Sequence, residues 1–214
     1  MITITGFKWV PEFAKGLVRD LRVRWACEEA GLPYQTKLID QKEKASDAYR
    51  ALQPFCQVPA YEDDQVKLFE SGAMVLRIAE KSEALLPKAD PGRARAIAWM
   101  FAALNSVEPS IIFLLLADVF RADEPWTKQA HPTIEALVRK KLGDVAQHLS
   151  DRTWLEADRF TAGDLMMATT LRFLRHTDLV TADPVLGPYL ARCEDRPAFR
   201  RALEAQMTSF AEAA

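Results

Sequence analysis

The chain has 214 residues, of which 49% are hydrophobic and 27% are charged. This composition is ordinary for a soluble globular protein with one large domain or two small ones. The formal net charge of -2 gives no electrostatic reason to expect binding to nucleic acid or to an anionic membrane.

The three cysteines, Cys27, Cys56 and Cys193, are far apart in the chain and odd in number. Without a CxxC pair or a His-Cys group of zinc spacing, they predict reduced thiols in a reducing compartment and no metal site. The N-terminus lacks a basic-then-apolar signal pattern, and the apolar run from Ile111 is too short for a membrane span. We therefore expect a cytoplasmic protein with no nucleic-acid or membrane partner.

The first half of the chain alternates predicted strands and helices. Strands are expected at residues 1–5 and 34–39, and on both sides of the turn Asp63-Asp64-Gln65. Helices are expected from Gly16 to a stop at Gly31, over 44–52, and from Ser71 onward. The predicted order is βαβαββα, an α/β arrangement.

A change in composition divides the chain after this region. The stretch LPKADPG at 86–92 is rich in Pro, Asp and Gly, which is typical of a linker. Beyond it we expect only helices, near 92–120, 131–150, 162–177, 183–193 and 197–211. The predicted limits are a first domain at 1–84, a linker at 85–91 and an all-helical domain at 92–214.

One helix start in the second half carries a complete set of capping residues. In RFTAGDLMMA, Thr161 is placed to be the N-cap and Asp164 stands at the third helical position. Both side chains can accept hydrogen bonds from first-turn amides, as in a capping box. We interpret Asp164 as a structural cap in preference to a catalytic acid.

Proline at position 59 stands where the third strand is expected to begin. Proline lacks a backbone donor and therefore belongs at the first residue or edge of a strand. A cis bond between Val58 and Pro59 would turn the backbone of Val58 away from the sheet. An extended peptide could then pair with Val58 like a short added strand.

Glu70 and Ser71 open a helix directly after a predicted strand. The N-terminus of a helix offers free N–H groups and partial positive charge, which suit a ligand carboxylate. Ser71 can donate to that carboxylate, and Glu70 can accept from an ammonium group. Together with Val58, they suggest a short peptide ligand with a free α-amino-acid end.

These stretches resemble the glutathione S-transferase superfamily. The resemblance rests on VRWACEEAGLPY at 23–34, QPFCQVPAYEDDQVKLFESGAMVLRIAEK at 53–81 and FTAGDLMMATTL at 160–171. With the domain order it covers nearly the whole chain. It implies a thioredoxin-like N-terminal domain, an all-helical C-terminal domain, and a cytosolic homodimer of the bacterial type that serves in detoxification with glutathione as co-substrate.

By position, the resemblance also implies the roles of individual residues. Val58, before a cis-Pro59, would pair with the cysteinyl part of glutathione, and Glu70 and Ser71 would hold its γ-glutamyl end. Gln57 stands where family members reach the glycyl carboxylate. The hydrophobic second substrate would lie between the domains, and its candidate contacts are Trp9, Val10, Met100, Ala103 and Asn105. Core packing is the better interpretation of Trp99 and Met100, because both follow helical spacing.

The chain departs from the family where the glutathione sulfur is expected. Family members stabilise the thiolate with a Tyr late in the first strand, or with a Ser or Cys at the start of the first helix. A donor is needed because a free thiol has a pKa of about 8.5. Here Val10 precedes Pro11 where the Ser or Cys would be expected, and Thr5 falls near the position of the Tyr. The segment that follows Pro11 is also longer than usual, by roughly two helical turns.

Three interpretations of the sulfur environment remain open. Backbone N–H groups near Val10 or at the first helix could stabilise the thiolate. Thr5, Lys15 or Arg19 could do so with a side chain, although surface positions are the simpler interpretation of the two basic residues. In the third interpretation, the protein binds glutathione without conjugating it.

The predicted function is therefore conjugation of glutathione to small hydrophobic electrophiles. The alternatives are a non-catalytic ligand-binding protein and a glutathione-dependent disulfide or peroxide reductase or isomerase. Cys56 lacks a resolving partner and is interpreted as a packing residue. The histidines His131, His148 and His176 are scattered singly and suggest no metal pair or triad.

Overall fold

The computed structural model describes residues 1–89, 91–156 and 158–212. The described chain forms two compact units. One contains Met1–Leu86 together with the C-terminal segment from Asp195, and the other contains Pro87–Glu194. The first unit holds a thioredoxin-like sheet and the second is helical, so the predicted fold class is confirmed.

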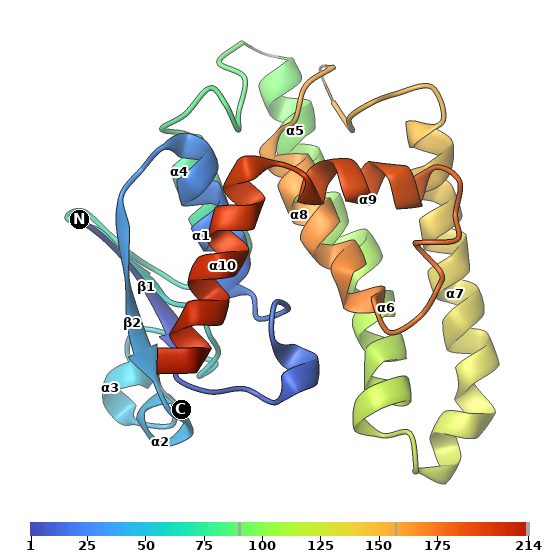
Figure 1. Cartoon of the computed structure of the whole chain (residues 1–214), viewed down its shortest axis with the longest axis horizontal. Helices are drawn as coiled ribbons and strands as arrows, with labels where there is room; N and C mark the ends of the chain where they lie inside the picture. The colour runs from blue at the N-terminus through green and yellow to red at the C-terminus, as the bar shows by residue number, and fades with distance from the viewer. Residues whose placement is uncertain (90, 157, 213–214) are drawn as a thin grey trace. The chain divides into compact units, whose positions relative to one another are not determined.

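The sheet of the first unit has the strand order β2-β1-β3-β4. Its elements are β1 (Ile2–Phe7), α1 (Asp20–Ala30), β2 (Tyr34–Ile39), α2 (Gln41–Lys44), α3 (Asp47–Arg50), β3 (Tyr61–Glu62), β4 (Lys67–Leu68) and α4 (Ser71–Ala79). Strand β1 runs parallel to β2 and antiparallel to β3, and β3 pairs antiparallel with β4. With α2 and α3 in the place of one helix, this is the predicted βαβαββα order (Figure 1).

The local prediction was wrong at the start of α1. The helix was expected from Gly16, but it begins at Asp20. Gly16 has a φ of 74°, which a right-handed helix does not allow, and a short 3₁₀ helix at Glu12–Ala14 precedes it. Residues 8–19 therefore form a long irregular connection between the end of β1 and α1.

The C-terminal helix α10 (Pro197–Glu212) packs on α1 within the first unit (Figure 1). Trp25 is fully buried between them and makes an edge contact with Phe199, with ring centroids 4.8 Å apart. Arg196 from the start of α10 holds Glu29 through two hydrogen bonds of 2.5 and 2.7 Å. The predicted domain limits stay a prediction, although these contacts group α10 with the first unit rather than with the helices before it.

A buried polar group also joins α10 to the beginning of α1. Arg24 donates to Asp20 at 2.8 Å and to Ser209 at 3.3 Å, and Gln206 donates to Asp20 at 2.6 Å. Burial raises the pKa of the Asp20 carboxyl, and the charge of Arg24 counteracts this. Because α10 covers α1 on the side away from α4, the polar residues of α1 lie inside the unit.

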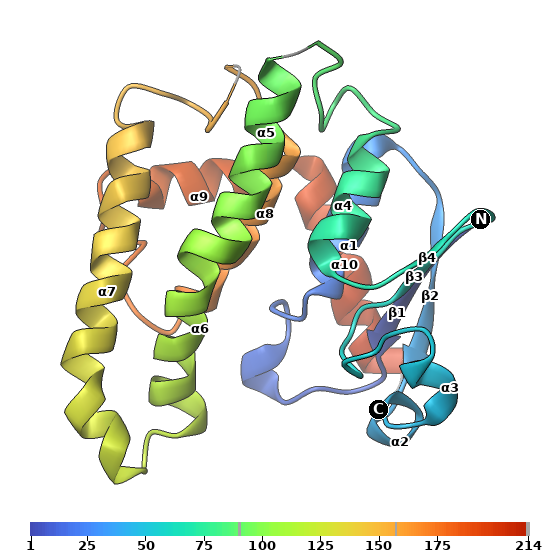
Figure 2. The same ribbon diagram turned by 180° about the vertical axis from the view of Figure 1, so that it is seen from behind.

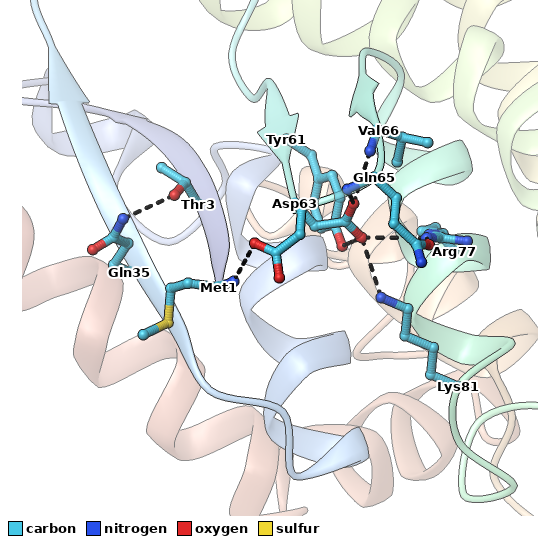
Figure 3. A network of polar contacts seen from close by, with 10 residues as sticks. Met1, Thr3, Gln35, Tyr61, Asp63, Gln65, Val66, Arg77 and Lys81 are labelled. Carbon is cyan, nitrogen blue, oxygen red and sulfur yellow. Dashed lines mark hydrogen bonds and ion pairs between the residues drawn. The ribbon is translucent and has the colours of Figure 1, made fainter.

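Asp63 organises the hairpin that leads to α4 (Figure 3). Its carboxylate accepts hydrogen bonds from the N–H groups of Gln65 and Val66 and from the Tyr61 hydroxyl, each at 2.9 Å. Lys81, just beyond α4, donates to the same carboxylate at 3.1 Å. Burial opposes ionisation of Asp63, but these donors hold the pKa of its carboxyl well below the usual range. The predicted turn is therefore confirmed and is tied to the helix that follows it.

The second unit is a set of packed helices. They are α5 (Gly92–Phe101), α6 (Glu108–Leu115), α7 (Pro125–Leu149), α8 (Ala162–Leu171) and α9 (Leu186–Glu194). Two π-helical turns, at Ala102–Val107 and Leu116–Phe120, continue α5 and α6 into one stretch. Helix α5 packs on α8, and α6 packs on α7 (Figure 2). Helix α7 begins six residues earlier than expected, because Pro125 occupies its first turn and Pro132 is accommodated inside it.

The stretch Gly92–Phe120 is long and apolar enough to cross a membrane by length and composition alone. The run from Ile111 that was considered from the sequence is too short to span a membrane, whereas this longer stretch has the necessary length. Half of its most apolar window is buried inside the protein, and the core helix of a soluble protein meets the same requirement. Burial within the second unit therefore accounts for its apolar character.

The predicted cap of α8 is confirmed. Thr161 is the N-cap residue, and the Asp164 carboxylate accepts a hydrogen bond from its N–H at 2.9 Å. The same carboxylate accepts from the N–H of Leu155 at 2.9 Å and from the Tyr189 hydroxyl at 3.0 Å. Asp164 is fully buried. It therefore joins the loop before α8 to α9, as well as capping the helix.

Candidate functional site

The peptide bond between Val58 and Pro59 is cis. Pro59 leads into the sheet through Ala60, whose carbonyl accepts a hydrogen bond from the N–H of Thr5 at 2.9 Å. Within the described part of the chain, the N–H and C=O of Val58 have no backbone hydrogen-bond partner. The Val58 backbone therefore has both groups available, and its pairing with an added peptide stays a prediction.

Tyr49 fixes the residues that precede this bond. Its hydroxyl donates to the carbonyl of Gln57 at 2.8 Å. Burial raises the pKa of Tyr49 to about 12, so the phenol stays protonated at neutral pH. Thr5 is buried, with 3% of its surface exposed. The side chain of Gln57 is exposed.

Glu70 and Ser71 lie at the start of α4, as predicted. Glu70 is the N-cap residue and has a φ of 70°, a conformation that residues other than glycine rarely adopt. Its side chain is exposed and makes no capping hydrogen bond. Ser71 is 6% exposed, and its hydroxyl oxygen accepts a hydrogen bond from Arg22 of α1 at 3.2 Å.

An aromatic contact joins the two predicted parts of the peptide clamp. The rings of Phe55 and Phe69 meet edge to face, with their centroids 6.1 Å apart. Phe55 stands three residues before Val58, and Phe69 directly precedes Glu70. The loop before the cis bond and the start of α4 are therefore neighbours in the folded unit.

The irregular segment 8–19 holds the remaining candidates of the first unit. Trp9 is 63% exposed, whereas Val10 is buried. Lys15 forms an ion pair with Glu12 at 2.7 Å, and Arg19 is the N-cap residue of α1. The structure therefore leaves a large exposed indole beside a buried valine in this segment.

The cysteines differ in their surroundings. Cys27 and Cys193 are buried. Burial, followed by the nearby charge of Glu28, raises the pKa of Cys27 to about 12, which makes it a poor nucleophile. Cys56 is partly exposed and has a φ of 51° in the loop before Val58.

In the second unit, Met100 and Ala103 are buried and Asn105 is exposed. Trp99 packs against His148 with the two rings tilted by 45° and their centroids 4.5 Å apart. The role of Met100, Ala103 and Asn105 in a substrate pocket stays a prediction.

Two of the histidines are not isolated, contrary to the sequence interpretation. His131 and His176 each hydrogen-bond one oxygen of Asp118, at 2.8 and 2.9 Å. The fold brings them together from positions that are 45 residues apart in the chain. Over the described residues, no group of three or more His, Cys, Asp or Glu side chains is arranged to hold a metal ion.

Comparison with known proteins identifies the family. The family model of the glutathione S-transferase N-terminal domain matches residues 21–86. Glutathione S-transferase F11 of Arabidopsis thaliana is 29% identical over 181 residues, which cover 78% of this chain and 82% of that protein. Residues 21–86 therefore belong to the glutathione S-transferase N-terminal domain family, and the chain as a whole is similar to glutathione S-transferases.

Solved structures of this superfamily share the fold of the whole chain. Glutathione transferase F2 from Populus trichocarpa has a TM-score of 0.83 at 24% identity, covering 97% of this chain and 100% of that chain. A family member from Pseudomonas fluorescens with two glutathione bound has a TM-score of 0.81 at 22% identity, covering 95% of this chain and 92% of that chain.

Sequence reasoning missed two residues that contact the predicted site residues: Arg22, which contacts Ser71, and Tyr49, which contacts Gln57. Arg22 lies three residues from Trp25 and four from Ala26, so it shares their face of α1. A charged residue on an apolar helix face was the available signal. Tyr49 sits in a short helix whose packing the sequence pattern does not reveal.

Proposed function

We propose that this chain is a glutathione transferase that conjugates glutathione to small hydrophobic electrophiles through a stabilised thiolate. The observation that carries the proposal is the combination, in one unit of the superfamily's fold, of a cis Val58–Pro59 bond with a helix that opens at Glu70-Ser71. The relatives named glutathione S-transferases and the glutathione-bound Pseudomonas structure support glutathione as the co-substrate.

Each end of the tripeptide has a candidate partner in the first unit. The Val58 backbone would pair with the cysteinyl residue like an added strand, next to Pro59. The first-turn N–H groups of α4 and the Ser71 hydroxyl would bind the α-carboxylate of the γ-glutamyl residue. The exposed carboxylate of Glu70 would accept from the α-ammonium group, and Gln57 would reach the glycyl carboxylate.

For the thiolate, we propose backbone donors in the segment 8–19. Of the side-chain candidates, Lys15 is already paired with Glu12, and Thr5 is a buried residue of β1. Among the described residues, the N–H of Val10 makes no backbone hydrogen bond. A hydrogen bond to the sulfur anion would lower the thiol pKa and raise the fraction of nucleophile at neutral pH.

The chemistry itself is then a displacement or addition. The sulfur forms a new bond to the electrophilic carbon, and a leaving group such as chloride departs with the electron pair, or a carbanion is protonated. The exposed Trp9 supports an apolar surface next to the sulfur. The contacts expected of Val10, Met100, Ala103 and Asn105 with the second substrate stay a prediction, and we propose a cytoplasmic homodimer.

Calorimetric titration with glutathione tests the binding step. We expect saturable binding that Glu70→Gln weakens about tenfold or more, because a charged hydrogen bond to the ammonium group is lost. Glu62→Gln serves as the control, since it removes an acid of the same hairpin that pairs with Lys67 at 2.8 Å. Absence of binding by the wild type would reject the proposal.

Ultraviolet titration of the bound thiol tests the chemical step. A thiol pKa below that of free glutathione supports catalysis, and conjugation of an activated aryl chloride should then follow the same pH dependence. The variants Thr5→Val and Lys15→Met should leave the thiol pKa unchanged if backbone groups are the donors. Binding with an unshifted thiol pKa would instead favour the non-catalytic ligand-binding protein.

A further inference from the structure

Arg22 is a buried cation at the beginning of the proposed γ-glutamyl site. It lies in the first turn of α1 and is 1% exposed. Its Nη1 atom donates to the hydroxyl oxygen of Ser71 at 3.2 Å, across 49 residues of chain. The contact therefore joins α1 to the first residue of α4.

The position of this guanidinium is electrostatically significant. Removing a charge from water is costly, and the N-terminus of α4 already carries partial positive charge. The hydrogen bond to Ser71 brings the guanidinium of Arg22 to that end of the helix. An anion that binds at Ser71 would interact favourably with both, whereas a neutral group would gain from neither.

The hydrogen bond also fixes the role of the Ser71 hydroxyl. A serine hydroxyl has one hydrogen to donate and two lone pairs that accept. Arg22 occupies a lone pair of the oxygen, and Glu70 rather than Ser71 is the N-cap residue of α4. The hydrogen of the Ser71 hydroxyl is then left to donate to a ligand oxygen.

We infer that Arg22 is a positioning residue for binding of the ligand α-carboxylate: it holds Ser71 as a donor and adds positive charge behind it. This inference rests on the proposed function, because it assigns the ligand carboxylate to the γ-glutamyl residue of glutathione. Arg22 acts through Ser71 and is not itself assigned a contact with glutathione.

The test compares two ligands on the same variants. One is glutathione, and the other is its analogue in which hydrogen replaces the γ-glutamyl α-carboxylate. Arg22→Met should weaken glutathione about tenfold to a hundredfold, in keeping with the loss of a charge-assisted interaction. Affinity for the analogue should change less than twofold. In turnover assays KM for glutathione should rise while kcat stays near the wild-type value.

Arg24→Met is the matched control. Arg24 lies two residues further along α1, is 2% exposed, and bonds Asp20 and Ser209 rather than Ser71. Its loss should lower thermal stability without discriminating between glutathione and the analogue. Should Arg22→Met fail to fold, Arg22→Lys replaces it. This variant keeps the charge and should recover part of the discrimination.

A double-mutant cycle with Ser71→Ala completes the test. If Arg22 acts through Ser71, Arg22→Met should cost much less glutathione affinity in the Ser71→Ala background than in the wild type. Equal weakening of both ligands, or no weakening of either, would overturn the inference while the proposed function stands. Failure of the wild-type protein to bind glutathione would overturn both.

Discussion

Replacement of Asp164 by alanine would remove the acceptor of four hydrogen bonds. The donors are the N–H groups of Leu155 and Thr161 at 2.9 Å and the hydroxyls of Thr161 and Tyr189 at 3.0 Å. The Thr161 hydroxyl can rotate to a new partner, whereas the other three donors would stay buried without an acceptor. Each buried donor left unpaired costs about 1–3 kcal/mol. We therefore expect a loss of at least about 3 kcal/mol, a large part of the roughly 5–15 kcal/mol that stabilises a protein.

Thermal and urea unfolding of the variant measure this loss. For a chain of this size, the midpoint should fall by about 6–12 °C. The control is Asp183→Ala, since Asp183 is partly exposed and accepts only from the N–H groups of Val185 and Leu186, at 2.9 and 2.8 Å. Water can replace it, so a loss of about 1 kcal/mol is expected. An Asp164→Ala protein of wild-type stability that has lost turnover would refute the cap and support a catalytic acid.

Three further predictions concern the first unit. Hydrogen-bond donors lower the pKa of the Asp63 carboxyl in the folded protein. The ionised carboxyl therefore contributes its full stabilisation of the fold above the unfolded-state pKa of about 3.9, and this contribution is lost as pH falls toward the folded-state pKa. The stability difference between wild type and Asp63→Asn should therefore be constant from pH 6 to pH 8, about 2 kcal/mol, and shrink below pH 4 in urea unfolding. A double-mutant cycle of Glu29 with Arg196 should give a coupling of about 1–3 kcal/mol, since Glu29 is nearly buried and the pair is bidentate; a coupling near zero would show that α10 is held by apolar contacts alone. Tyr49→Phe should cost about 1 kcal/mol of stability and weaken glutathione binding in calorimetry, and unchanged affinity would contradict its support of the clamp.

Signals that act over a few residues were read correctly from the sequence. Thr161 and Asp164 stand at the spacing of a capping box, and the turn from Asp63 is closed by its own side chain. Glu70 and Ser71 open α4 because a strand ends and apolar helical spacing begins there. These features depend on bonds within one turn, so their pattern is visible in a single sequence.

Features that depend on distant segments were not predicted. The helical spacing of α1 suggested one apolar face, but Asp20 to Cys27 are all buried because α4 and α10 cover different sides. The burial of Arg22 and Arg24 follows from this sandwiching, which no local pattern encodes. The start of α1 was also misplaced. Gly16 has a left-handed backbone that a right-handed helix does not allow, so the helix begins only at Asp20.

The two ends of the proposed site have different structural supports. The clamp end is held by side chains of helices beside the sheet, since Tyr49 of α3 bonds Gln57 and Arg22 of α1 bonds Ser71. The sulfur end lies in the segment 8–19, whose last residues are held by α10, since Gln206 donates to the carbonyl of Val18 at 3.1 Å. Gln206 is fully buried and bonds Asp20 as well. The C-terminal helix therefore supports the segment that is proposed to stabilise the thiolate, and changes in α10 should affect the thiol pKa of bound glutathione before they affect its affinity.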